Sequence, residues 1–174
     1  GGFNQLNLRS LMAYSSISHL GWMLISMVYS ETLWIMYYLF YIILSIIMVL
    51  FFNNYSIFHL NQIYSMNFNP YMKFMMLTNM LSLGGLPPFL GFLPKLLVIN
   101  LLASFKMFLM ILLMVMLTLI TLFYYIRITY TAFMLMYPSL NWFKNNYKNI
   151  NFHIILNTIS ILGFPFISLI YSLL

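Results

Sequence analysis

The sequence reads Leu83-Gly84-Gly85-Leu86-Pro87-Pro88 in the middle of an apolar segment that runs from residue 71 to residue 103. This segment is too long for one straight crossing, since a helix rises about 1.5 Å per residue and the hydrocarbon core of a bilayer is about 30 Å thick. Proline removes backbone donors and glycine disfavours helix, so a break is predicted at residues 84–88. Broken helices at membrane depth line cavities or ion paths in transporters, although a kink that only shapes packing would leave the same pattern.

Four more apolar segments are long enough to cross a membrane as helices: residues 12–29, 32–52, 107–136 and 150–174. Strands are excluded because an open sheet edge cannot lie in hydrocarbon, and these runs are too continuous for a barrel. The predicted fold is therefore an all-α, polytopic transmembrane bundle of about five spanning segments, one of them broken. Residues 1–174 are expected to form a single membrane domain, with residues 53–70 as the longest connection and Glu31 in a short loop.

The composition excludes several classes of protein. Hydrophobic residues make up 64% of the chain and charged residues 5%, against about 25% charged residues in a soluble domain. The basic residues stand singly, so no patch could follow a nucleic-acid backbone. The absence of cysteine excludes disulfides and thiolate-bound metals within the chain, and His19, His59 and His153 are too dispersed to suggest a haem or metal site.

The charges also predict an orientation. The residue usage, rich in Met, Phe and Tyr, is typical of proteins encoded in AT-rich mitochondrial genomes, which fits the lack of a targeting segment. If the N-terminus lies on side one, Glu31 and Lys106 fall on side two, and four basic residues fall on side one: Arg9, Lys73, Lys144 and Lys148. Basic residues gather on the side of synthesis. We therefore expect an inner-membrane protein with side one in the matrix and the C-terminus toward the intermembrane space.

Lys95 is the strongest candidate for chemistry. It lies seven residues beyond Pro88, deep in the broken segment. A charged ammonium is costly in hydrocarbon, so the side chain should face the bundle interior or water. Burial disfavours the charged form, which would let this lysine gain and lose a proton as a relay. Alternatively, its long side chain could reach the nearer interface.

His19 is the second candidate. Ser15, His19, Trp22 and Ser26 follow a spacing of four, three and four, which places them on one helical face. Histidine titrates near neutral pH and can pass a proton through either ring nitrogen. A neutral histidine bonded to a neighbouring helix would leave the same signal.

Arg127 and a threonine stripe are weaker signals in the segment 107–136. Arg127 is expected to snorkel toward the side-one interface. The stripe is expected to join helices rather than to conduct anything; its members are Thr118, Thr121, Tyr125 and Thr129.

Three stretches together resemble the subunit 2 family of mitochondrial NADH dehydrogenase. They are Leu8-Arg9-Ser10-Leu11-Met12-Ala13-Tyr14-Ser15-Ser16-Ile17-Ser18-His19-Leu20-Gly21-Trp22-Met23, Leu83-Gly84-Gly85-Leu86-Pro87-Pro88-Phe89 with Gly91-Phe92 and Pro94-Lys95, and Tyr124-Tyr125-Ile126-Arg127. The resemblance implies an antiporter-like subunit in the membrane arm of respiratory complex I, similar to Mrp-type antiporters, with a central line of lysines, histidines and acids that carries protons. It places Lys95 on the family's lysine beside a broken helix and His19 beside the central axis.

The resemblance also sets expectations for partners and cofactors. The chain should contact other membrane-arm subunits and lipid, and bind neither nucleic acid nor a soluble substrate. It should hold no redox cofactor, since NADH, FMN, Fe–S clusters and ubiquinone belong elsewhere in the complex. The chain begins with Gly1, and Glu31 is its single acid; we interpret it as a C-terminal half whose missing half supplies the acid partner of Lys95.

Two other functions fit the same residues. A stand-alone cation/proton antiporter would exchange cations without electron transfer. A structural scaffold subunit would need the helices for assembly but would not use Lys95 to move protons.

Overall fold

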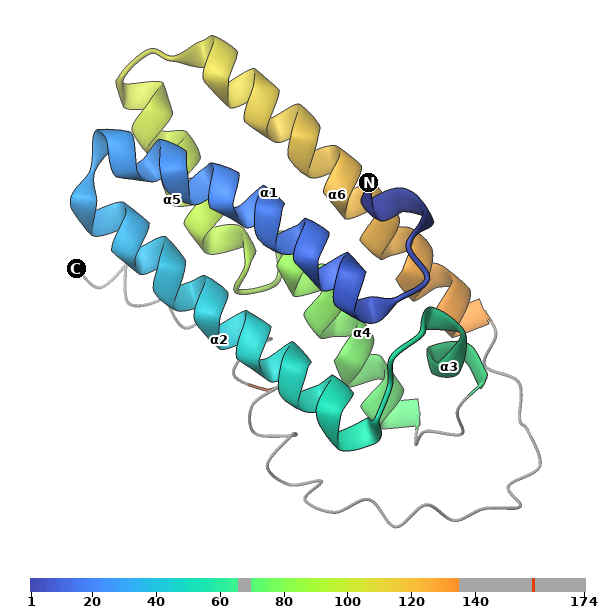
Figure 1. The fold of residues 1–174 in the computed structure, drawn as a ribbon. Coiled ribbons are helices and arrows are strands. Elements are labelled where there is room, and N and C mark those ends of the chain that lie inside the picture. Colours follow the sequence, from blue (N-terminus) through green and yellow to red (C-terminus); the bar gives the residue numbers. More distant parts are fainter. Residues whose placement is uncertain (66–69, 135–157, 159–174) are drawn as a thin grey trace.

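The computed structural model describes residues 1–65, 70–134 and 158 and forms a helical bundle (Figure 1). A short 3-10 turn, η1 (Gly2–Asn4), precedes six α-helices, listed in chain order: α1 (Leu8–Tyr29), α2 (Glu31–Tyr55), α3 (Leu60–Ser65), α4 (Pro70–Gly84), α5 (Phe92–Ser104) and α6 (Phe108–Met134). Within these ranges the all-α prediction is confirmed. The segment predicted at 150–174 and the basic residues Lys144 and Lys148 lie outside the described residues.

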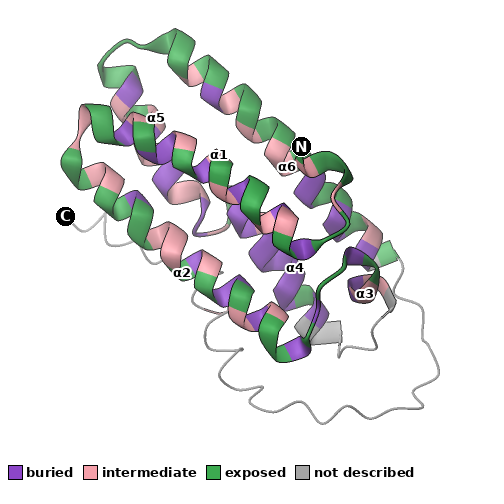
Figure 2. Cartoon of the chain, viewed as in Figure 1, coloured by how far each residue is buried: buried purple, intermediate pink, exposed green. Residues whose placement is uncertain are grey.

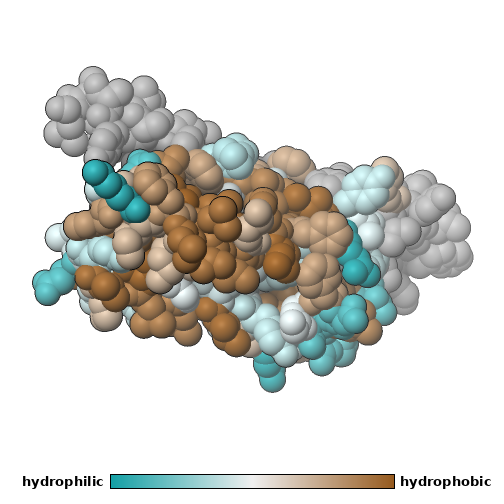
Figure 3. Space-filling model, turned by 90° about the horizontal axis from the view of Figure 1, so that it is seen from above, coloured by the Kyte–Doolittle hydropathy of each residue, from teal (hydrophilic) through white to brown (hydrophobic). Residues whose placement is uncertain are grey.

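In the part of the chain that the structure describes, three helices are long and apolar enough to cross a membrane, namely α1, α2 and most of α6 (Phe108–Ala132). The predicted segment 71–103 is divided into α4 and α5, so the break is confirmed, and its non-helical part extends from Gly85 to Gly91. Seen from above, apolar side chains cover the middle of the molecule and hydrophilic ones gather toward its ends (Figure 3). This banding is expected where lipid surrounds the middle of a bundle.

The helix connections define two ends of the bundle. At one end, Ser30 alone separates α1 from α2, and Tyr29 stacks on Phe105 with ring centroids 5.0 Å apart. At the other end, Asn7 forms a β-bridge with His59. The structure therefore brings Glu31 and the α5–α6 turn to side two, opposite the start of α1, as the charges predict.

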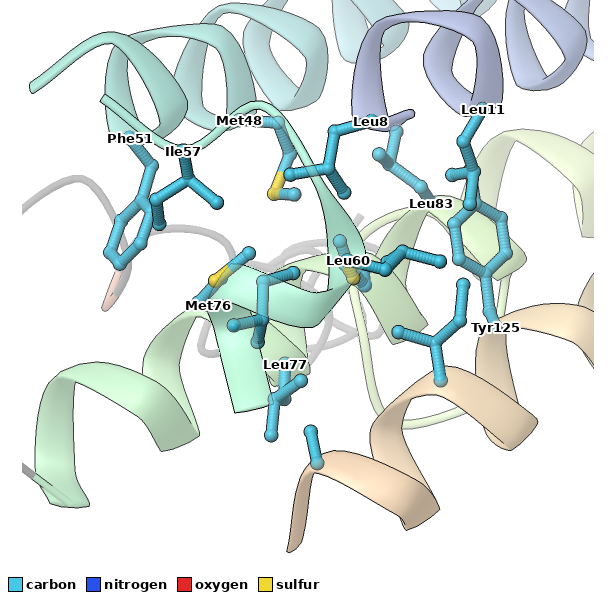
Figure 4. Close-up of a cluster of buried hydrophobic side chains, with 14 of the residues drawn as sticks. Leu8, Leu11, Met48, Phe51, Ile57, Leu60, Met76, Leu77, Leu83 and Tyr125 are labelled. Atoms are coloured by element: carbon cyan, nitrogen blue, oxygen red, sulfur yellow. The ribbon is translucent and has the colours of Figure 1, made fainter. Parts of the chain in front are cut away.

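Two apolar clusters hold the bundle together. The larger occupies the side-one half and joins α1, α2, α4 and α6 through side chains such as Leu11, Met48, Met76 and Tyr125, each at most 1% exposed (Figure 4). Burial is concentrated on the inward faces, while the outer faces of α1, α2 and α6 are exposed (Figure 2). The smaller cluster lies toward side two, and its buried members are Trp22, Met23, Tyr37, Val98, Leu102 and Met114.

The connection expected at residues 53–70 is more ordered than predicted. Helix α2 continues to Tyr55, and α3 occupies Leu60–Ser65. Leu60 donates a backbone hydrogen bond to Leu6, and Ile63 is fully buried. The Gln62 side chain accepts the His59 amide at 3.1 Å, as in a capping box. The connection therefore contains a helix of six residues that tertiary contacts stabilise and that its polar composition does not indicate.

Glu31 also differs from its predicted place in a loop. It is the first residue of α2, where the partial positive charge of the helix N-terminus favours an acid. The only acid of the chain therefore lies at the side-two end of the bundle, at the start of α2, and not in the broken segment between α4 and α5.

Candidate functional site

The break ends α4 with a defined hydrogen-bond pattern. Gly85 adopts φ +86°, its amide donates to Ser82, and the Leu86 amide donates to Leu81. These two bonds form a Schellman motif. The motif requires a left-handed backbone at the position of Gly85, and glycine adopts this conformation without steric cost. The motif satisfies two carbonyl groups of the last turn of α4 but does not use that of Gly84.

Lys95 satisfies this carbonyl. Its Nζ donates a 2.8 Å hydrogen bond to the Gly84 oxygen, and the side chain is 6% exposed. Lys95 lies in the first turn of α5, where a positive charge is disfavoured, and it reaches back to the negative end of α4, where one is favoured. The side chain therefore points into the bundle rather than toward either interface, which excludes the snorkelling alternative.

Two glycines make room for this arrangement. A Cβ on Gly85 would lie 2.8 Å from Lys95 Nζ, and a Cβ on Gly91 would lie 1.8 Å from the Ser82 oxygen. Side chains at these positions would push apart the two halves of the broken segment. The glycines thus hold the end of α4 and the start of α5 in direct contact.

His19 approaches the same helix end from α1. Its Nδ1 lies 2.9 Å from the Tyr37 hydroxyl of α2, and its ring stacks on Tyr41 with centroids 4.9 Å apart. The ring also interacts with the Leu83 carbonyl and with the charge of Lys95. A proton on Nε2 would let the ring donate to Leu83 while Nδ1 accepts from Tyr37.

The predicted face of α1 is confirmed, since Ser15, His19, Trp22 and Ser26 are all buried. The structure brings His19 and Lys95 together at the end of α4, a meeting that their separation in the sequence does not indicate. Lys95 donates to the Gly84 carbonyl, and the His19 ring lies near the preceding carbonyl, that of Leu83. Their use as proton relays stays a prediction.

The other candidates lie away from this meeting point. Arg127 is exposed and lines a cavity at the side-one half of α6. The hydroxyls of Thr118, Thr121 and Thr129 donate to carbonyls of their own helix, so the stripe joins helices through the packing of Tyr125 rather than through its threonine hydroxyls. A hydroxyl contact between helices comes from Thr131, whose Oγ1 lies 3.0 Å from the Tyr64 hydroxyl of α3.

Sequence reasoning missed two neighbours of the site. Tyr37 is 1% exposed and holds His19, but it stands in an aromatic-rich apolar run that gives no signal of a polar contact. Tyr125 was assigned to the threonine stripe, yet its ring packs on Gly84, since a Cβ there would lie 3.4 Å from Tyr125 Cδ2. A tyrosine can contribute an apolar body and a polar tip at once, which hides such roles in a sequence.

The arrangement gathers groups that can exchange protons. It combines a titratable amine, an imidazole and tyrosine hydroxyls with helix-end carbonyls inside an apolar bundle. Among the described residues, no group of three or more His, Cys, Asp or Glu side chains could hold a metal ion. The amine, the imidazole and the hydroxyls can donate and accept hydrogen bonds, which is what the predicted proton relay requires.

Comparisons with known proteins agree with this chemistry. Residues 1–121 match the family described as NADH:quinone oxidoreductase/Mrp antiporter, transmembrane. NADH-ubiquinone oxidoreductase chain 2 of Aedes aegypti is 52% identical over 178 residues, covering 100% of this chain and 52% of the relative. The protein of the same name from Anopheles gambiae is 49% identical, with 100% and 52% coverage. That of Anopheles albimanus is 49% identical over 94% of this chain and 99% of the relative. The chain thus spans about half the length of the first two relatives.

Proposed function

The chain belongs to the NADH:quinone oxidoreductase/Mrp antiporter transmembrane family, and from this premise we propose that it is a membrane-arm subunit of NADH:ubiquinone oxidoreductase, respiratory complex I. In that role it contributes to proton translocation that is driven by electron transfer elsewhere in the complex. It lies in the mitochondrial inner membrane with side one in the matrix, contacts lipid and other membrane-arm subunits, and contributes no redox cofactor.

The observation that carries the proposal is the bond between Lys95 and Gly84. A buried ammonium 2.8 Å from the open carbonyl of a broken helix is stabilised in its charged form by the negative helix end, and in its neutral form by the apolar surroundings. An acid approaching from a neighbouring subunit would favour loading. Its withdrawal would favour release, either to His19 or to water.

The experiment measures protons translocated per NADH oxidised in the assembled complex. Lys95→Ala removes the amine, and Lys95→Arg keeps a charge that does not titrate, because the pKa of arginine exceeds 12. We expect both to reduce translocation strongly, and Lys95→His to restore part of it, since histidine titrates. Lys106→Arg is the matched control, because Lys106 is exposed in the turn before α6.

The outcomes separate the proposal from its rivals. If Lys95→Arg pumps like the parent, a fixed charge is sufficient and the chain is a scaffold at this site. If the parent exchanges cations for protons without NADH oxidation, the stand-alone antiporter replaces the proposal. Assembly of each variant is checked first, so that a folding defect is not counted as a pumping defect.

A further inference from the structure

We propose that the tyrosine pair Tyr124–Tyr125 forms a proton entry route from side one to Lys95, and that the apolar cluster around Leu102 closes Lys95 from side two. This inference rests on the proposed function and adds to it a direction of access and two residues. It is carried by a cavity, by two buried hydroxyls, and by the unequal packing of the two halves of the bundle.

The route begins at a cavity of about 400 Å³ between the N-terminal segment, α3 and α6. Its polar lining includes Gln5, Tyr64, Arg127 and Thr131. A water molecule occupies about 30 Å³ in the liquid and needs two to four polar partners, so this cavity has both the volume and the partners for several waters. Arg127 is exposed, and its charge is therefore screened by solvent.

Tyr124 lines this cavity and connects it with the interior. Its ring contacts that of Tyr125 at a centroid distance of 4.5 Å. Both hydroxyl oxygens are buried, and neither has a hydrogen-bond partner among the described residues. Leaving a buried hydroxyl without a partner is unfavourable, so two adjacent ones indicate a site that water enters.

The inner end of the route lies at the break. Tyr125 is 1% exposed, its ring packs on Gly84, and the Gly84 carbonyl accepts the bond from Lys95. The Tyr125 hydroxyl lies near that of Ser15, one helical turn before His19. Water between these groups would complete a chain of donors and acceptors in which each hydroxyl accepts one proton and passes on another, so no charge remains on a tyrosine.

A second cavity, of about 420 Å³, lies between α1 and α6 and reaches Trp22 and Met114, but its lining includes neither Lys95 nor the α5 residues Val98 and Leu102. In the side-two half of the bundle, Trp22, Val98, Leu102 and Met114 pack together, and each is at most 8% exposed. Leu102 is fully buried one to two turns beyond Val98 on α5, the helix that carries Lys95. Val98 and Leu102 are apolar and at most 1% exposed, so they offer water no polar partner on the side-two side of Lys95, and a proton on Lys95 would exchange with side one in this conformation.

The first test compares tyrosine-to-phenylalanine variants in the assembled complex. Tyr124→Phe and Tyr125→Phe keep the rings and their packing, so we expect the complex to assemble normally. Proton translocation should fall about tenfold, a change of roughly 1.4 kcal/mol in a barrier. Tyr130→Phe is the matched control on the same helix, because Tyr130 is 59% exposed.

Two results distinguish this inference from the proposed function. If Lys95→Ala stops translocation while both phenylalanine variants pump like the parent, the entry route is wrong and the proposed function stands. If Lys95→Ala pumps normally, the proposed function fails. The entry route is then tested only by the cysteine labelling described next.

Access is measured with single cysteines, which this cysteine-free chain permits. A membrane-impermeant thiol reagent should label Tyr125→Cys from side one only, and should leave Leu102→Cys unlabelled from side two. Labelling is read on the peptide of this chain by mass spectrometry. Labelling of Tyr125→Cys from side two or from neither side, or labelling of Leu102→Cys from side two, overturns the route.

Discussion

The Cα atom of Gly91 lies directly against the backbone carbonyl of Ser82, so that a Cβ at this position would fall 1.8 Å from the Ser82 oxygen. That oxygen already accepts the Gly85 amide within the Schellman motif, and it cannot withdraw without opening the end of α4. The contact fixes the start of α5 against the end of α4 and thereby fixes the position of Lys95.

Gly91→Ala should consequently destabilise the protein. Overpacking costs about 1–3 kcal/mol, and we expect the upper part of this range because the neighbour is backbone. The measurement is thermal unfolding of the purified protein in detergent. Gly21→Ala is the control, since a Cβ there meets nothing within 4 Å and alanine favours a helix by about 0.5–1 kcal/mol over glycine. Equal stability of the two variants would contradict the contact.

Gly85→Ala should show a cost that depends on Lys95. The left-handed backbone at φ +86° costs an alanine about 1–2 kcal/mol, and the new Cβ would also displace the Lys95 ammonium. A double-mutant cycle with Lys95→Ala separates these contributions. We expect the cost of Gly85→Ala to fall in the Lys95→Ala background to that of the backbone alone. An unchanged cost would mean that the lysine moves aside freely.

Tyr37→Phe should loosen His19. It removes the hydroxyl that lies 2.9 Å from Nδ1 and leaves a buried ring nitrogen without this partner, at a cost of about 1–3 kcal/mol. Tyr38→Phe on the neighbouring, 46% exposed position should change stability by less than about 0.5 kcal/mol. Unfolding midpoints of the two variants check the difference, and NMR of labelled histidine reports whether the tautomer of His19 changes.

Reporter sites should divide into two groups by side. Tags placed at Ser30 or Lys106, which lie in turns at one end of the bundle, should become accessible together. A tag next to Arg9 should be accessible from the opposite side, and we expect that side to be the matrix because basic residues gather there. Protease protection in mitoplasts and in inverted vesicles measures this. Access to Arg9 from the intermembrane space would reverse the orientation.

The sequence was sufficient for the spanning helices because each is long and continuously apolar. The break between Gly84 and Gly91 was equally predictable, since paired prolines and glycines have no other common use in a helix. The helix at Leu60–Ser65 could not be predicted from the sequence, because it depends on contacts with the N-terminal segment rather than on local helix preference.

The site was predictable one residue at a time but not as a group. Lys95 and His19 stand out because polar side chains are rare in these segments. Their meeting depends on how α1 packs against α4 and α5, and single-sequence patterns carry no information on that. The carbonyls they approach are backbone groups, which no residue type reveals.

The single residue between α1 and α2 limits how this site could rearrange. One extended residue spans at most about 3.6 Å, which is less than the 5.4 Å pitch of one helical turn. The two helices therefore cannot slide past each other, and His19 and Tyr37 travel as one rigid body. The seven residues from Gly85 to Gly91 form a longer connection, but the contact of Gly91 with Ser82 holds its two ends together. Any rearrangement that moves Lys95 relative to the histidine–tyrosine pair therefore has to break that contact first.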